Sequence, residues 1–435
     1  MKKQLVLFTV LALLISVGSV SAYDQMWGMR TTLGVDFPEI HASSAGLNTF
    51  ASVGGWYNGS WSQAANIEID GGAGLDGSFD FGVDTSQKFS FHGYSYTVYP
   101  ILDKLNFYGS TGIYAYRAGR QIAADPAGLI IDAPFDGADV TFNFGRSYLS
   151  AGVGFTGAVF SDSAEYFLTD SDTGRDSIVA VPRVMEYVEW GMPALTEEIN
   201  ISAFILALQD LTSDDDLAEN GNEKFHPVYL ELMADGFISE SFLYEAALVG
   251  LYGAYGDATV LAGLGRLGLS WLPGNANRFG IEVTAATGDD WDRGGYVLGS
   301  TTESSLSQYL PVSVVSSRGY VIEFEPGNLT SVALFYARRP RDTFSWEVRT
   351  TTFLRNVEGP VSSGLVSETS GSGAFLGQEA LVSWFWRPKS DFGWDLKFGV
   401  VYAGDPIEMD TELQEFWFDK APILFRLGFD WSWSF

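Results

Sequence analysis

The sequence contains no cysteine and only three histidines in 435 residues. Without cysteine the chain forms no disulfide, carries no lipid on a thiol and offers no thiolate to a metal. The three histidines, His41, His92 and His226, leave little for nucleophilic or metal catalysis. His92 lies two residues from Ser90 in one predicted strand, a common spacing that does not indicate a catalytic pair. We therefore expect neither enzyme activity nor a cofactor.

Positive charge is scarce as well. The chain has 25 Lys and Arg residues against 54 Asp and Glu residues, which gives a formal net charge of −29. Such a balance argues against nucleic acid as a partner. The acidic run Asp214–Asp216, followed by Asn220 and Asn222, departs from a calcium loop. Ala218 stands where an oxygen ligand belongs and Glu219 where glycine is needed, so we expect a solvated loop and no metal.

Long apolar runs are missing after residue 22, although 46% of the residues are hydrophobic. The one such run, Leu5–Val17, follows two lysines and precedes the small residues Val20–Ala22. It is shorter than the roughly 20 residues of a spanning helix, and it predicts a signal peptide over residues 1–22. The remaining hydrophobicity is dispersed through alternating segments. Because only helices and closed barrels satisfy every backbone group in a bilayer, residues 23–435 are predicted to form a transmembrane β-barrel.

The last nine residues, Leu427–Phe435, alternate strictly between large apolar and small or polar side chains. One face of this strand carries the aromatic residues Phe429, Trp431, Trp433 and Phe435, and the other carries small or polar residues. The segment resembles the C-terminal strand of bacterial outer-membrane barrels, above all because it ends on Phe. That resemblance implies insertion into the lipid of the outer membrane, with these four residues as the signal for the barrel-assembly machinery.

The spacing of alternating segments predicts a single antiparallel up-and-down barrel of about 18 strands, within a range of about 16 to 20. An even number places both termini on the periplasmic side with the short turns. Residues 23–45 are an N-terminal tail, a lumen-filling piece or an extra strand. The predicted strands are 47–57, 61–69, 75–83, 89–98, 105–116, 138–144, 148–159, 178–189, 197–208, 228–233, 239–251, 259–272, 279–287, 329–337, 344–355, 377–387, 392–403 and 422–435.

Charged residues of both signs alternate with the apolar residues of these strands, so they are predicted to line the lumen. They are Glu198, Arg266, Glu282, Glu347, Arg349, Arg355, Asp395, Lys397, Arg426 and Asp430. Such a mixture is costly in a dry interior and natural in a wet one. A barrel of this strand number is too wide for side chains to close, which favours a water-filled pore. The alternative is that the charges pair across strands inside a plugged barrel.

Short motifs add a narrower resemblance. Ala118–Gln121, Asp136–Phe142, Ala286–Asp290 and Leu376–Asp391 are similar to strand ends of porins in the alginate-export family. The resemblance implies an 18-stranded channel for anionic sugars or other small molecules. Because the predicted lumen mixes both signs, only the channel role is carried over. Arg120, within the first motif, is either a charge lining the pore or a strand-end residue that bonds a loop backbone.

These observations predict an outer-membrane channel for passive diffusion of small hydrophilic solutes. The alternative is a surface-interaction or structural barrel with a blocked lumen. The long connection Gly288–Asn328 distinguishes the two, since it forms a constriction or plug if it folds inward and a binding surface if it projects outward. The solute and the oligomeric state stay open.

Overall fold

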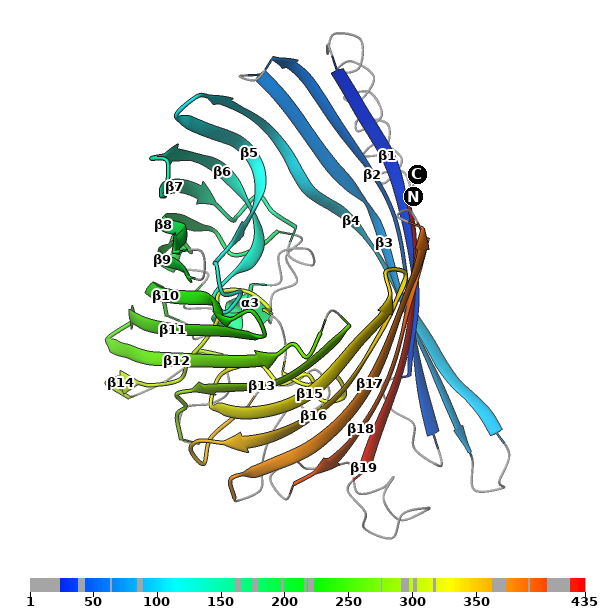
Figure 1. The fold of residues 1–435 in the computed structure, drawn as a ribbon. Helices are drawn as coiled ribbons and strands as arrows, with labels where there is room; N and C mark the ends of the chain where they lie inside the picture. The colour runs from blue at the N-terminus through cyan, green and yellow to red at the C-terminus, as the bar shows by residue number, and fades with distance from the viewer. Residues whose placement is uncertain are drawn as a thin grey trace.

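A computed structural model describes residues 24–37, 44–62, 65–83, 89–160, 166–173, 179–196, 199–214, 217, 223–274, 276–290, 297–299, 303–315, 318–361, 373–389, 392–404 and 423–434 (Figure 1). The predicted signal peptide, residues 1–22, lies outside the described residues and stays a prediction. None of the helices in the described part of the chain is long and apolar enough to cross a membrane.

Eighteen long antiparallel strands form a closed barrel, and a two-residue strand, β14, lies in the connection between β13 and β15. The strands are β1 (Asp24–Phe37), β2 (Ser44–Ser62), β3 (Ala65–Val83), β4 (Phe89–Thr111), β5 (Tyr114–Ala124), β6 (Asp132–Asn143), β7 (Tyr148–Phe155), β8 (Arg183–Thr196), β9 (Ile199–Asp210), β10 (Phe225–Ser239), β11 (Phe242–Tyr255), β12 (Ala258–Trp271), β13 (Asn277–Ala286), β14 (Ser305–Leu306), β15 (Leu329–Arg341), β16 (Phe344–Arg355), β17 (Phe375–Lys389), β18 (Phe392–Ala403) and β19 (Ile423–Ser434).

The first and last strands close the ring. β1 pairs with β19 in a register that runs from Arg30 opposite Ser434 to Phe37 opposite Leu427. The other edge of β1 pairs with β2. With both edges of both terminal strands paired, the sheet has no open edge, which is the condition for placing strands in lipid.

The connections differ in length at the two ends of the barrel. Short turns join β2 to β3, β4 to β5, β8 to β9, β10 to β11, β15 to β16 and β17 to β18. The connections that are longest in sequence follow β7, β13, β16 and β18, and the strand ends that they join lie at the opposite end. The start of β1 pairs beside the β2–β3 turn, and the end of β19 pairs with β1, so both described termini lie at the short-turn end.

The outer wall is apolar because successive residues of each strand point to opposite faces. Leu248, Leu261 and Leu334, on three of the strands, are each more than half exposed. Toward the short-turn end, ring contacts link neighbouring strands, including Trp271 with Phe279 at 5.6 Å and Phe279 with Tyr336 at 4.4 Å. Such an aromatic band is typical of the level where a barrel meets the lipid headgroups.

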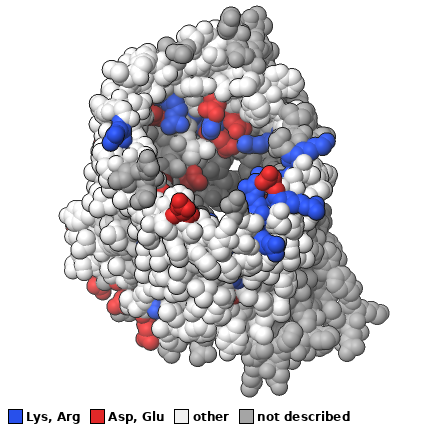
Figure 2. Space-filling model, viewed as in Figure 1, with Lys and Arg blue, Asp and Glu red and all other residues white. Residues whose placement is uncertain are grey.

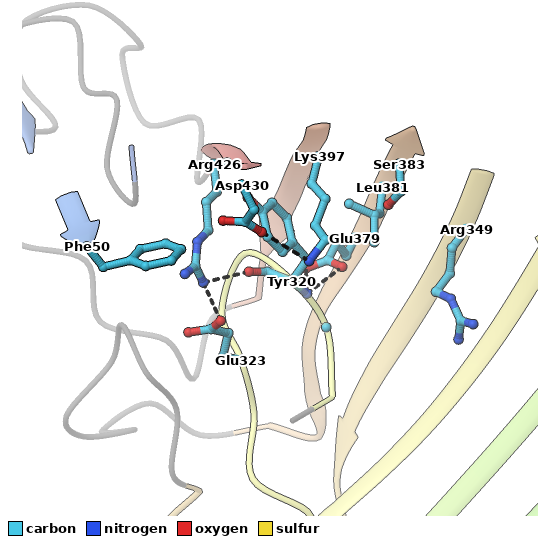
Figure 3. A pocket seen from close by; sticks show the side chains of 12 residues that line it. Phe50, Tyr320, Glu323, Arg349, Glu379, Leu381, Ser383, Lys397, Arg426 and Asp430 are labelled. Atoms are coloured by element: carbon cyan, nitrogen blue, oxygen red, sulfur yellow. Dashed lines mark hydrogen bonds and ion pairs between the residues drawn. The ribbon is translucent and has the colours of Figure 1, made fainter. Parts of the chain in front are cut away.

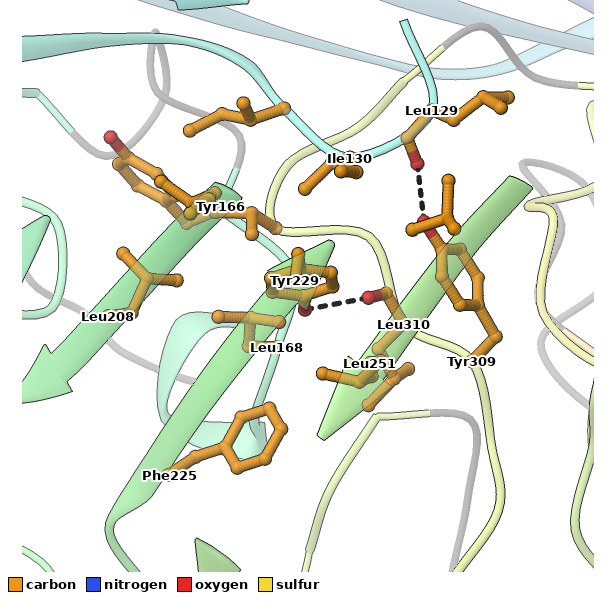
Figure 4. Packing of buried hydrophobic residues seen from close by; sticks show 14 of the residues in the cluster. Leu129, Ile130, Tyr166, Leu168, Leu208, Phe225, Tyr229, Leu251, Tyr309 and Leu310 are labelled. Carbon is orange, nitrogen blue, oxygen red and sulfur yellow. Dashed lines mark hydrogen bonds between the residues drawn. The ribbon is translucent and has the colours of Figure 1, made fainter. Parts of the chain in front are cut away.

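A hydrophobic core lies inside the barrel. The connections after β5, β7 and β13 turn inward and pack on the inner faces of β8 to β12, as Figure 1 shows. The short helix α3 (Asp170–Thr173) belongs to the β7–β8 connection. Figure 4 shows Leu129, Ile130 and Leu168 from the connections against Tyr229 and Leu251 of the wall. This part of the lumen is therefore filled with apolar side chains, as in a soluble protein.

The predicted strand number is confirmed, but several of the predicted boundaries were wrong, above all in the first third of the chain. Segments 61–69 and 75–83 are one strand, β3, because Gly71 and Gly72 continue the ladder rather than forming a turn. A Cβ on Gly72 would lie 2.2 Å from the Val53 carbonyl oxygen, so glycine permits a close approach of β2 and β3. Segment 105–116 contains the real turn, where Gly112 has a φ of +58°. β1, within residues 23–45, is the extra strand that restores the count.

Replacing Leu334 by Arg tests the lipid-facing assignment. Leu334 is 52% exposed on the outer wall, so the variant should lose about 2–4 kcal/mol of folding stability in lipid vesicles if it lies near the bilayer midplane. Ala337→Arg is the matched control, because Ala337 faces the lumen opposite Glu347. Urea unfolding of both variants in vesicles gives the comparison, and equal losses would contradict the assignment of the two faces.

Candidate functional site: a charged constriction in the lumen

The connection between β13 and β15 crosses the interior of the barrel. The Tyr309 hydroxyl donates to the Leu129 carbonyl oxygen at 2.8 Å. The Val312 amide donates to the Ile130 carbonyl oxygen at 2.7 Å. From the wall, the Tyr229 hydroxyl donates to the Leu310 carbonyl oxygen at 2.8 Å (Figure 4). The described part of this connection therefore folds into the lumen and does not project outward as a binding surface.

The tip of the connection is held by charged groups of the opposite wall. The Glu379 carboxylate on β17 accepts the amides of Tyr320 and Val321 at 2.9 Å and 2.7 Å. Arg426 on β19 donates to the Tyr320 carbonyl oxygen at 2.8 Å and forms an ion pair with Glu323 at 2.6 Å (Figure 3). Hydrogen bonds to charged groups are worth roughly 1.5–3 kcal/mol each, so together these contacts fix the tip in place.

A pocket of about 520 Å³ lies between the tip and the wall. It is lined by three cationic side chains, Arg349, Lys397 and Arg426, and by the carboxylates of Glu323, Glu379 and Asp430 (Figure 3). The Lys397 ammonium is 4.0 Å from the Asp430 carboxylate, which is a loose contact. Figure 2 shows the molecule hollowed, with acidic and basic side chains gathered around the hollow.

A second cavity of about 410 Å³ lies between β10, β11, β12, β13 and β15. Arg266 and Glu245 form an ion pair in it. Arg278 donates to the Ser270 hydroxyl at 3.0 Å and makes no ion pair with any residue that the structure describes. The Phe335 ring contacts two guanidinium groups, with Arg278 at 5.1 Å and Arg349 at 4.8 Å. Because Arg349 also lines the first pocket, cationic groups are spread along this wall.

Arg318 places a further guanidinium in the connection. It is 9% exposed and lies 3.4 Å from the Glu282 carboxylate, which is also 3.7 Å from Arg349. Desolvation lowers the pKa of Arg318 from its usual value, and the Glu282 carboxylate opposes this shift. Arg318, Glu282 and Arg349 therefore connect the base of the tip to the wall.

Most of the predicted lumen residues lie on the inner face. The ladders and contacts turn eight of them inward, namely Arg266, Glu282, Glu347, Arg349, Asp395, Lys397, Arg426 and Asp430. Arg355 also turns inward but is only 3% exposed, and it donates to the carbonyl oxygens of Gly359 and Gly373. It therefore holds the β16–β17 connection and does not line open space. Glu198 lies outside the described residues.

Of the two interpretations of Arg120, the contacts favour the strand-end residue over the pore-lining charge. In the ladder, Arg120 pairs with Asp136, and Asp136 pairs with Phe155, whose ring is exposed on the outer wall. Arg120 is 8% exposed, binds the Asp136 carboxylate at 2.7 Å and donates to the Ala158 carbonyl oxygen at 2.8 Å. It is the strand-end residue that bonds a loop backbone, because Gly119 and Gln121 take the inward positions beside it.

Phe429 and Trp431 of the predicted assembly signal are exposed on the outer wall. Trp433 pairs with Thr31 through the β1–β19 ladder, and Phe435 lies outside the described residues. Their role in assembly stays a prediction.

Glu379 and Arg278 line the two pockets but were not among the predicted lumen residues. Glu379 alternates with Leu381 and Ser383, all of which line the first pocket, while Trp384 and Trp386 lie on the opposite face. Extending the alternation of the tryptophans backwards would have placed Glu379 inside. Nothing in the sequence indicates that its partner is the backbone of a connection 58 residues away.

The fold is similar to solved structures of outer-membrane porins from Pseudomonas aeruginosa. OccK7 (OpdD) matches with a TM-score of 0.59 and 9% identity, over 95% of this chain and 99% of that one. OccK2 (OpdF), in complex with glucuronate, matches with a TM-score of 0.57 and 11% identity, over 94% of this chain and 96% of that one. OpdK with vanillate matches with a TM-score of 0.55 and 10% identity, over 95% of this chain and 99% of that one. No family model and no curated protein sequence matches the chain. At these identities the likeness establishes the fold, a closed 18-stranded barrel.

Glu379→Ala should loosen the tip of the connection, because the backbone amides of Tyr320 and Val321 lose the carboxylate that accepts their hydrogen bonds. The Glu379 side chain is buried, with 1% of its surface exposed, so water does not readily replace it. We expect a larger and noisier single-channel current in planar bilayers. Ser383→Ala is the control, since Ser383 lines the same pocket but is not one of the residues that hold the tip. Indistinguishable currents from the two variants would mean that Glu379 does not position the constriction.

Proposed function

We propose that the protein is an outer-membrane channel for passive diffusion of small hydrophilic solutes through a water-filled lumen of mixed charge. The observation that carries the proposal is the pocket between the tip of the β13–β15 connection and the wall, where charges of both signs face open space. Charges at this density are stable where water reaches them and costly where it does not. The closed barrel supplies the path, and the connection narrows it.

The similarity to porins supports the same function. Structures with this fold have been solved with glucuronate and with vanillate, which are both small carboxylates. In this chain Arg349, Lys397 and Arg426 line the first pocket and Arg278 lines the second, so a small carboxylate would meet cationic groups in both. Carboxylates nevertheless lie among these groups, so we do not extend the proposal to a polyanion. From the resemblance to alginate-export porins we retain the channel role alone.

The orientation follows from the same proposal. Bacterial barrels place short turns in the periplasm and long loops outside. The described termini and short turns would then face the periplasm, and the connections that fold inward would enter the lumen from the extracellular end. The predicted signal peptide and the aromatic C-terminal strand are consistent with export and assembly into the outer membrane.

Conductance of the purified protein in planar bilayers tests the proposal directly. The double variant Arg349→Glu/Lys397→Glu should insert normally and shift the reversal potential in a KCl gradient toward cation preference, because it replaces positive charge by negative charge in the lumen. Arg339→Glu is the control, since Arg339 lies at the exposed short-turn end of β15. A folded wild-type protein that passes no current would contradict the channel function.

The entry of a carboxylate can be measured separately. Liposomes that contain the protein should swell in isotonic glucuronate, and the double variant should slow this swelling more than it slows swelling in an uncharged sugar of similar size. Equal slowing for both solutes would show that the cationic groups do not select carboxylates, and it would leave the channel function standing.

A further inference from the structure

An apolar groove of about 560 Å³ opens on the outer wall at the short-turn end of β15 to β18. It is lined by the rings of Phe344, Trp386 and Trp394, by Pro340 and Arg341 at the end of β15, and by Thr343 of the β15–β16 turn. The register places these groups on one face, because Arg341 pairs with Phe344, Phe344 with Trp386 and Trp386 with Trp394. That face is the lipid-facing one, since the Trp394 ring packs against Phe429, which is exposed on the outer wall.

Two guanidinium groups stand beside this groove. Arg341 lines it, and Arg338 pairs with Trp346 on the same face of the sheet. Both are exposed, and neither forms an ion pair with any residue in the described ranges. Arg339 differs, because it lies 3.7 Å from the Asp342 carboxylate. In a chain with 25 basic and 54 acidic residues, two uncompensated arginines at the edge of an aromatic groove are a local reversal of charge.

The chemistry of the groove matches one kind of molecule. A guanidinium binds phosphate oxygens in a bidentate manner. Aromatic rings at the membrane interface pack against the first methylenes of an acyl chain, and basic side chains at that level attract anionic headgroups. A ligand with a negative headgroup and an apolar tail would place the first on the arginines and the second along the rings.

We propose that this groove is a binding site for an anionic phospholipid. The phosphate and its charged headgroup lie on Arg338 and Arg341, and the upper part of one acyl chain lies along Phe344, Trp386 and Trp394. The site is at the short-turn end, so the lipid belongs to the periplasmic leaflet in the proposed orientation. The inference uses no group of the lumen and is therefore independent of conduction.

Native mass spectrometry of the full-length protein, released from mixed micelles of phosphatidylglycerol and phosphatidylethanolamine, tests this site. The wild type should retain phosphatidylglycerol in preference to phosphatidylethanolamine. Arg341→Gln should lower the occupancy by phosphatidylglycerol about fivefold, and Arg338→Gln/Arg341→Gln should lower it further, as expected for one charge at a membrane surface. Glycerol 3-phosphate, which lacks acyl chains, should not displace the lipid.

Arg339→Gln is the matched control, because it removes the same charge from the same end of β15 but from a residue that already contacts a carboxylate. It should leave lipid retention unchanged. The proposal is overturned if Arg339→Gln and Arg341→Gln have equal effects, if neither has any, or if both lipids are retained equally by the wild type. Single-channel conductance should be the same for all of these variants, so a failure of the lipid site is distinguishable from a failure of the channel.

Discussion

The closure of the sheet is the constraint on which the rest of the structure depends. In hydrocarbon an unpaired backbone amide or carbonyl costs several kcal/mol, so a strand can lie there only between two partners. The β1–β19 ladder supplies the last of these partnerships. Closure also fixes the two environments of every strand, since each side chain must then face either lipid or the enclosed space. The alternation of residues follows from this, as does the placement of charges inside.

Alternation is also why the sequence predicted so much of the barrel. β16 and β18 were predicted to the residue, because Trp346, Val348, Trp394 and Phe398 alternate with polar neighbours. The prediction failed where composition imitates a turn. Gly71 and Gly72 fell in the gap between two predicted strands, although they continue β3 and permit its close approach to β2. The turn between β4 and β5 was also misplaced, at residues 99–104 instead of 112–113, and the total survived because β1 replaced the strand that was counted twice.

The interior could not be predicted in the same way. Connections have no periodicity, so nothing in residues 287–328 says which wall they contact. The contacts that decide it are single polar groups far apart in the chain, such as Glu379 with Val321 and Tyr229 with Leu310. The position of Arg120 could not be predicted from the sequence either. Its charge suggested the lumen, while the ladder through Asp136 and Phe155 places it on the outer wall.

The inner hydrophobic core makes the barrel mechanically uneven. Strands β8 to β12 are supported on their inner faces by an extended cluster of close-packed apolar side chains. Strands β16 to β19 carry a smaller apolar cluster, which packs on Val321, Ile322 and Phe324 of the connection beside the charged pocket. Packed interiors resist deformation far more than a sheet bordered by water. Thermal motion of the wall should therefore be larger beside the charged pocket than along β8 to β12, and the width of the pocket is governed by the motion of β16 to β19 relative to the tip of the connection.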